Sequence, residues 1–97
     1  MQLTREKMTR HFRFKVVLKK CSGGFRFPVI ESAYKFNIKG SVKKVHGLEY
    51  LVVVEGEEAN ILAFKSWLEQ GSFGSPILSL TEEELHVQNL TSFEIVQ

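Results

Sequence analysis

Two glycines and an arginine stand close together near the start of the chain, in Cys21-Ser22-Gly23-Gly24-Phe25-Arg26-Phe27-Pro28. Glycine allows a positive backbone φ and lets another group approach the backbone closely. The start of a helix offers N–H groups without partners and the positive end of a dipole. An arginine adds a fork of donors that suits phosphate or carboxylate. The coincidence of these features predicts an anion-binding segment.

The segments on either side must position this site. Before it, Phe12, Phe14, Val16 and Leu18 occupy alternate positions, which predicts a half-buried strand over about residues 11–20. After it, Pro28 suits the first turn of a helix, where its missing N–H has no partner in any case. We therefore expect a tight turn from a strand into a helix that covers about residues 28–37.

The remaining chain predicts three further strands and a second helix. Strands are expected over about 39–45 and 48–55, and a helix from Gly56-Glu57-Glu58 to the C-cap residue Gly71. A fourth strand starts at 77–80, with its continuation to residue 87 left open, and a short strand covers 92–96. Two interleaved right-handed crossovers then predict an α+β, ferredoxin-like βαββαβ sandwich. It has a four-stranded antiparallel sheet with two helices on one face, plus a short C-terminal strand.

The length of 97 residues suits one domain. We expect a flexible extension over residues 1–10 and a single domain over 11–97. The sequence contains no run of 18 apolar residues, so it predicts no membrane-spanning helix. The single cysteine, Cys21, is consistent with a reducing, cytoplasmic setting, and we expect a monomer.

Charge is distributed unevenly along the chain. Residues 1–44 hold 12 of the 13 Lys and Arg residues, whereas residues 45–97 hold nine of the eleven Glu residues. A basic field around the glycine turn would steer an anionic ligand toward it. The alternative is that the two parts of the chain attract each other across the fold, and the sequence leaves both possibilities open.

Several short motifs, in order and at fixed spacing, resemble the acylphosphatase family. That family has a Gly-x-Gly-Phe-Arg loop after its first strand, where this chain has Ser22-Gly23-Gly24-Phe25-Arg26. The family's Gly-Trp-Val-Arg-Asn corresponds to Gly40-Ser41-Val42-Lys43-Lys44. Trp67-Leu68 and the ending Phe93-Glu94-Ile95 also match. The resemblance covers about residues 12–96.

The resemblance implies hydrolysis of carboxyl-phosphate anhydrides, with the loop amides and the arginine holding the phosphate. The implied binding residues are Cys21, Ser22, Gly23, Gly24, Phe25 and Arg26, and the implied catalytic residues are Arg26 and Lys44. In the family an asparagine positions the attacking water, and Lys44 stands in its place. A protonated lysine has three donors and no acceptor. We therefore expect acyl phosphate to bind and to turn over slowly, without a metal or another cofactor.

Two other functions are compatible with parts of this pattern. One is a non-catalytic module that keeps the anion site and has lost hydrolysis. The other is RNA binding, because Gly24 to Val29 faintly resembles an aromatic RNA-binding motif. That motif belongs inside a central strand, where Pro28 could not donate to the ladder, so the placement disfavours nucleic acid. The three histidines and one cysteine have no metal-site spacing.

Overall fold

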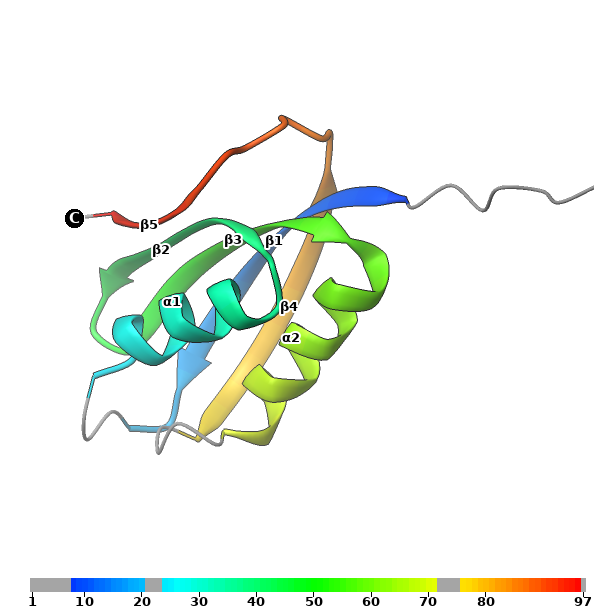
Figure 1. Ribbon diagram of the computed structural model, residues 1–97. Helices are drawn as coiled ribbons and strands as arrows, with labels where there is room; N and C mark the ends of the chain where they lie inside the picture. The colour runs from blue at the N-terminus through cyan, green and yellow to red at the C-terminus, as the bar shows by residue number, and fades with distance from the viewer. Residues whose placement is uncertain (1–7, 21–23, 72–75, 97) are drawn as a thin grey trace, which may run out of the picture.

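The computed structural model describes residues 8–20, 24–71 and 76–96. Seven elements follow one another along the chain: β1 (Thr9–Leu18), α1 (Arg26–Lys35), β2 (Lys39–His46), β3 (Glu49–Glu57), α2 (Glu58–Gln70), β4 (Ile77–Leu85) and β5 (Phe93–Val96). Figure 1 shows both helices covering the same face of the sheet.

The sheet has the strand order β4-β1-β3-β2-β5. The contacts of β1 with β3, β1 with β4 and β2 with β3 are all antiparallel. The predicted ferredoxin-like arrangement is thus confirmed, with β1-α1-β2 and β3-α2-β4 as interleaved crossovers. The short last strand joins the same sheet as a fifth strand, parallel to β2.

The boundaries of some elements differ from the sequence prediction. β1 begins at Thr9 and ends at Leu18, so Thr9 and Arg10 belong to the sheet. α1 begins at Arg26, which places Pro28 third in the helix, still within the first turn. Gly56 and Glu57 complete β3, and α2 starts only at Glu58. The pairing of Thr9 with Glu57 and of Arg10 with Gly56 extends β1 and β3 beyond the alternating apolar pattern.

The core lies between the helices and the sheet. Phe14, Val16 and Leu18 of β1 point into it, as their alternation predicts. The apolar stripe of α2, Ile61, Phe64 and Leu68, is also buried. Neither helix in the described part of the chain is long and apolar enough to cross a bilayer.

A buried carboxylate fastens the connection between β4 and β5 to the other face of the sheet. Residues 86–92, which form no helix or strand, include Gln88 and Leu90, whose backbone N–H groups donate to Glu55 over 2.6 Å each. Nδ1 of His11 donates to the same carboxylate over 3.0 Å. Both side chains are buried, at 2% exposure for His11 and 3% for Glu55. We call residues 86–92 the C-terminal strap.

We predict that Glu55 makes the fold sensitive to acid. Burial raises the pKa of Glu55, but hydrogen bonds from Gln88, Leu90 and His11 outweigh it, so the pKa is lowered overall. A lowered pKa adds stability above the ordinary carboxyl pKa, and this stability is lost as pH falls through the folded pKa. Glu55→Gln should lower the unfolding free energy near pH 7 by about 1–3 kcal/mol. The reason is that its side-chain NH2 group would face a buried N–H that needs an acceptor. Urea unfolding at several pH values tests this.

The control is Glu94→Gln, since Glu94 is exposed and, among the described residues, its side chain hydrogen-bonds only to Ser92. It should leave both the stability and its acid dependence nearly unchanged. Equal acid dependence for wild type and Glu55→Gln would contradict the prediction.

Candidate functional site

Among the described residues, the first turn of α1 has no side-chain cap and no acidic residue. Gly24 has φ +87°, and no other described residue lies where a Cβ would be. Phe25 is the N-cap residue and forms no side-chain capping hydrogen bond, and the first turn contains no acid. Val29 already donates to the Phe25 carbonyl over 3.3 Å. The N–H groups of Arg26 and Phe27 therefore have no partner within the helix, and no acidic side chain of that turn offsets the positive end of the dipole.

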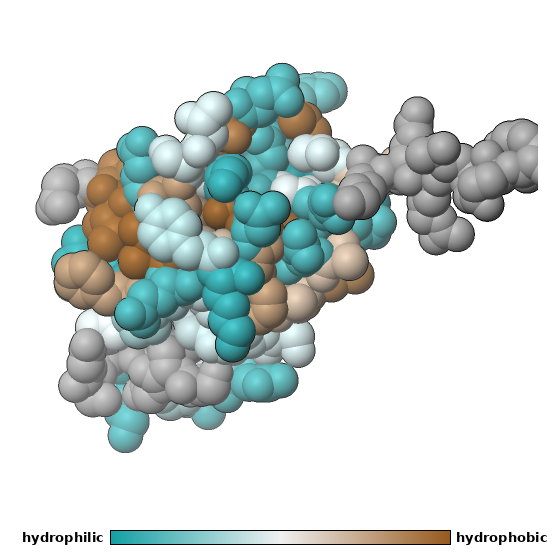
Figure 2. Space-filling model, in the orientation of Figure 1, coloured by the Kyte–Doolittle hydropathy of each residue, from teal (hydrophilic) through white to brown (hydrophobic). Residues whose placement is uncertain are grey.

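The side chains of this turn separate into buried and accessible ones. Phe25 is 1% exposed, so only its backbone could contact a ligand. Arg26 is half-buried, and Phe27 is 74% exposed. The predicted site residues Cys21, Ser22 and Gly23 lie outside the described residues. In the view of Figure 2, hydrophobic residues gather at the left of the molecule, which is the side where α1 begins in Figure 1.

Strand register places Lys44 on the helix-covered face of the sheet. Lys44 pairs with Tyr50 of β3, and Tyr50 pairs with Val16 of β1. Directly paired residues share a face, and Val16 and Tyr50 are buried in the core. Neighbouring strands lie ~4.8 Å apart, so Lys44 is about two strand spacings from Val16. Lys44 itself is exposed, whereas Lys43 belongs to the opposite face.

The topology brings Lys44 to the same end of the domain as Arg26. β1 and β2 both run antiparallel to β3 and are therefore parallel to each other. Their last residues lie at one end of the sheet, and α1 starts after the turn that leaves β1. In Figure 1, α1 begins at the left, beside the arrowhead of β2, and the two elements are in contact.

One aromatic contact joins the two parts of the site, and sequence reasoning missed it. The rings of Phe25 and Tyr50 lie 4.6 Å apart between centroids, at an interplanar angle of 48°. Alternation along β3 indicates that Tyr50 faces the core, but no sequence signal identifies Phe25 as its partner. Phe25 thus anchors the turn directly above the strand that pairs with Lys44.

Charges are paired on one part of the domain and unpaired on another. Arg10 bonds to Glu84 over 2.7 and 2.9 Å and to Glu58 over 3.1 Å. Arg13 pairs with Glu83, and Lys65 pairs with Glu82. The hydrogen bond from Arg10 lowers the pKa of Glu84. Each of the three consecutive acids of β4 is therefore paired with a cation, and the pairs made by Arg10 and Arg13 join the two halves of the chain.

The cations at the candidate site are different. Among described residues, no ion pair involves any of the cations that follow β1, begin α1 or end β2: Lys19, Lys20, Arg26, Lys43 and Lys44. Lys35 and Lys39, at the other end of α1 and β2, also form no ion pair with described residues, so five of the seven such cations lie at the end of the domain where the anion site is predicted. The ion pairs of Arg10 and Arg13 support attraction between the halves, and steering of an anion stays a prediction.

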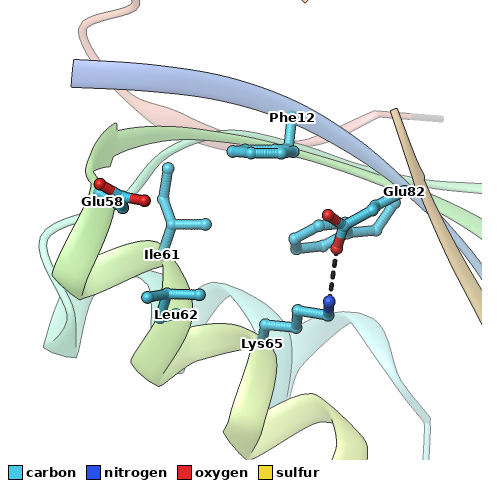
Figure 3. A pocket seen from close by; sticks show the side chains of 7 residues that line it. Phe12, Glu58, Ile61, Leu62, Lys65 and Glu82 are labelled. Carbon is cyan, nitrogen blue, oxygen red and sulfur yellow. Dashed lines mark hydrogen bonds and ion pairs between the residues drawn. The ribbon is translucent and has the colours of Figure 1, made fainter. Parts of the chain in front are cut away.

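A separate apolar hollow lies between α2 and the sheet (Figure 3). Phe12, Phe14, Ile61 and Leu62 line it together with Glu58, Lys65 and Glu82, and its volume is about 50 Å³. The ion pair of Lys65 with Glu82 stands at its side. Its one cation, Lys65, is already paired with Glu82, so the lining of the hollow offers no free cation to a phosphoryl group.

Within residues 8–20, 24–71 and 76–96, no three His, Cys, Asp or Glu side chains are grouped to hold a metal ion. The segment from Gly24 to Val29 is a turn followed by helix. It is not the strand that the RNA-binding motif requires.

Comparison with known proteins agrees with this geometry. A family model described as acylphosphatase matches residues 22–95. An acylphosphatase from Actinobacillus succinogenes is 38% identical over 61 residues, covering 63% of this chain and 68% of the relative. The structure of an acylphosphatase from Coxiella burnetii superposes with a TM-score of 0.83 at 23% identity, covering 91% of this chain and 93% of the other. One from Bacillus subtilis gives a TM-score of 0.83 at 25% identity, covering 93% and 100%.

Proposed function

Because the chain belongs to the acylphosphatase family, we propose that it binds acyl phosphates at the start of α1 and hydrolyses them slowly. The products are a carboxylate and inorganic phosphate. The observation that carries this proposal is a helix start without a side-chain cap, with Arg26 in its first turn and no acid in that turn.

The chemistry follows from charge on the phosphoryl group. Backbone N–H groups of the turn and the Arg26 guanidinium would hold the phosphoryl oxygens, on which negative charge is spread in the transition state. Donors that are already fixed in place stabilise this charge without reorganisation. The unpaired lysines at this end would draw the anion toward the site.

Water activation is the weak step of the proposed mechanism. The family resemblance assigns the positioning of water to the residue at Lys44. A protonated Lys44 can donate to phosphate but cannot accept a proton from water. This supports slow turnover, and it equally supports the second candidate, a non-catalytic module that binds an anion.

We also propose that the protein works as a monomer in the cytoplasm, on a small anionic ligand and without a cofactor. The single cysteine supports a reducing compartment.

Phosphate binding is expected to depend on Arg26. Arg26→Gln should weaken binding of inorganic phosphate about tenfold or more, because a hydrogen bond to a charged group contributes about 1.5–3 kcal/mol. Titration followed by calorimetry, or by shifts of the amide signals of Gly24 to Phe27, measures this.

Arg13→Gln is the matched control. Arg13 lies on the sheet face away from the helices and pairs with Glu83. Arg13→Gln removes the same charge as Arg26→Gln, but on the other face of the sheet. It should therefore change phosphate affinity only slightly. Equal effects of the two substitutions would mean that only net charge matters and would overturn the proposed site.

A further inference from the structure

Tyr50 occupies a position that no part of the proposed chemistry uses directly. Its side chain is 4% exposed and lies in the core beneath the start of α1. On one side its ring contacts Phe25, with centroids 4.6 Å apart. In the sheet, Tyr50 is paired with Lys44 on β2 and with Val16 on β1.

These contacts make Tyr50 the link between the two cationic groups of the site. Phe25 is the N-cap residue, and Arg26 follows it immediately, so the support beneath Phe25 fixes where the first turn of α1 begins. On the sheet, Tyr50 and Lys44 are directly paired, so their side chains leave the same face as close neighbours. An aromatic pair at this separation is worth about 0.5–1.5 kcal/mol beyond its buried area.

We propose that Tyr50 is a positioning residue, whose ring sets the spacing between the anion-binding turn at Phe25–Arg26 and the side chain of Lys44. This inference rests on the proposed function, since it concerns the same anion. Tyr50 does not touch the phosphate. It acts by holding the turn and β2 at a separation at which one phosphoryl group can meet both Arg26 and Lys44.

The test compares removal of the ring with removal of an equivalent ring elsewhere in the core. Tyr50→Leu removes the ring that supports Phe25, and Tyr50→Phe keeps it. The matched control is Phe64→Leu, because Phe64 is fully buried on α2 and its ring packs against Trp67. Affinity for inorganic phosphate and the unfolding free energy are measured for each protein. Lys44→Gln is also measured twice, once in the wild-type protein and once in the Tyr50→Leu variant.

Tyr50→Leu should weaken phosphate binding about tenfold, whereas Tyr50→Phe and Phe64→Leu should stay within about twofold of wild type. Lys44→Gln should weaken binding in the wild type and have little further effect in Tyr50→Leu, because misplaced groups no longer act together. The coupling distinguishes positioning from a general loss of stability.

Failure of this inference and failure of the proposed function give different results. Wild-type protein that shows no saturable phosphate binding would overturn the proposed function together with this inference. Wild-type binding that Tyr50→Leu weakens no more than Phe64→Leu would overturn the inference alone. Independent, multiplicative effects of the Tyr50 and Lys44 substitutions would overturn it as well.

Discussion

Lys44→Asn should raise the turnover of benzoyl phosphate on the order of a hundredfold, because an amide can accept from and donate to an attacking water. Lys44 stands at the end of β2, on the face of the sheet that carries α1. An asparagine there would have its side chain on the same side as the anion-binding turn. A coupled assay of carboxylate or phosphate release measures the change.

Lys43→Asn provides the control for this experiment. Lys43 is the preceding residue and is also exposed, but it pairs with Leu51 and lies on the opposite face. It should leave turnover at saturating substrate nearly unchanged, because steering by its charge affects only association. A wild-type rate equal to that of an acylphosphatase with asparagine at this position would refute the proposed slow turnover. Binding of phosphate without turnover in both wild type and Lys44→Asn would instead favour the non-catalytic module.

Gly40→Ala is expected to cost more stability than any other substitution discussed. Gly40 has φ +145°, and a Cβ there would lie 1.8 Å from the backbone oxygen of Val53 and 2.6 Å from its carbonyl carbon. Backbone atoms in the middle of a sheet cannot move aside cheaply. We expect a loss of about 4 kcal/mol or more. Since small domains have only about 5–15 kcal/mol in total, much of the protein should be unfolded or aggregated. Circular dichroism and urea unfolding test this.

Gly47→Ala separates steric clash from backbone preference. Gly47 also has a positive φ, +54°, but nothing lies within 4 Å of the position of a Cβ. Its replacement should cost only about 1–2 kcal/mol, the price of a left-handed conformation for an L-residue. Equal losses at Gly40 and Gly47 would show that the approach of Val53 is not the cause. Gly40 lies in β2, four residues before Lys44. The close approach of Gly40 to the Val53 backbone therefore also holds the strand that carries Lys44 against β3.

Local patterns predicted the elements of the fold well. Alternation in β1, the stripe of Ile61, Phe64 and Leu68 in α2, and Gly71 as a left-handed C-cap with φ 64° all appear as expected. These features depend on a residue and its near neighbours in the chain, so a single sequence contains their signal. The order of the elements then restricted the topology to few arrangements.

Features that join distant parts of the chain were not predictable in the same way. The contact of Phe25 with Tyr50 and the bonds from Gln88 and Leu90 to Glu55 depend on three-dimensional placement. Glu55 carries no sign in its local sequence that it will be buried. For the candidate site, composition and spacing predicted the turn and Arg26, which stay predictions, whereas the face of the sheet on which Lys44 lies became clear only from strand register.

The last strand also protects the one that carries Lys44. β5 covers the outer edge of β2 with four paired residues, and Ser92 accepts a hydrogen bond from the N–H of Gly40 over 2.9 Å. A protease cut within the C-terminal strap would release this cover and leave a row of unsatisfied amides and carbonyls along β2. Exposed edges of this kind recruit strands from other molecules. Cleavage far from the anion site would therefore promote self-association through the edge next to it.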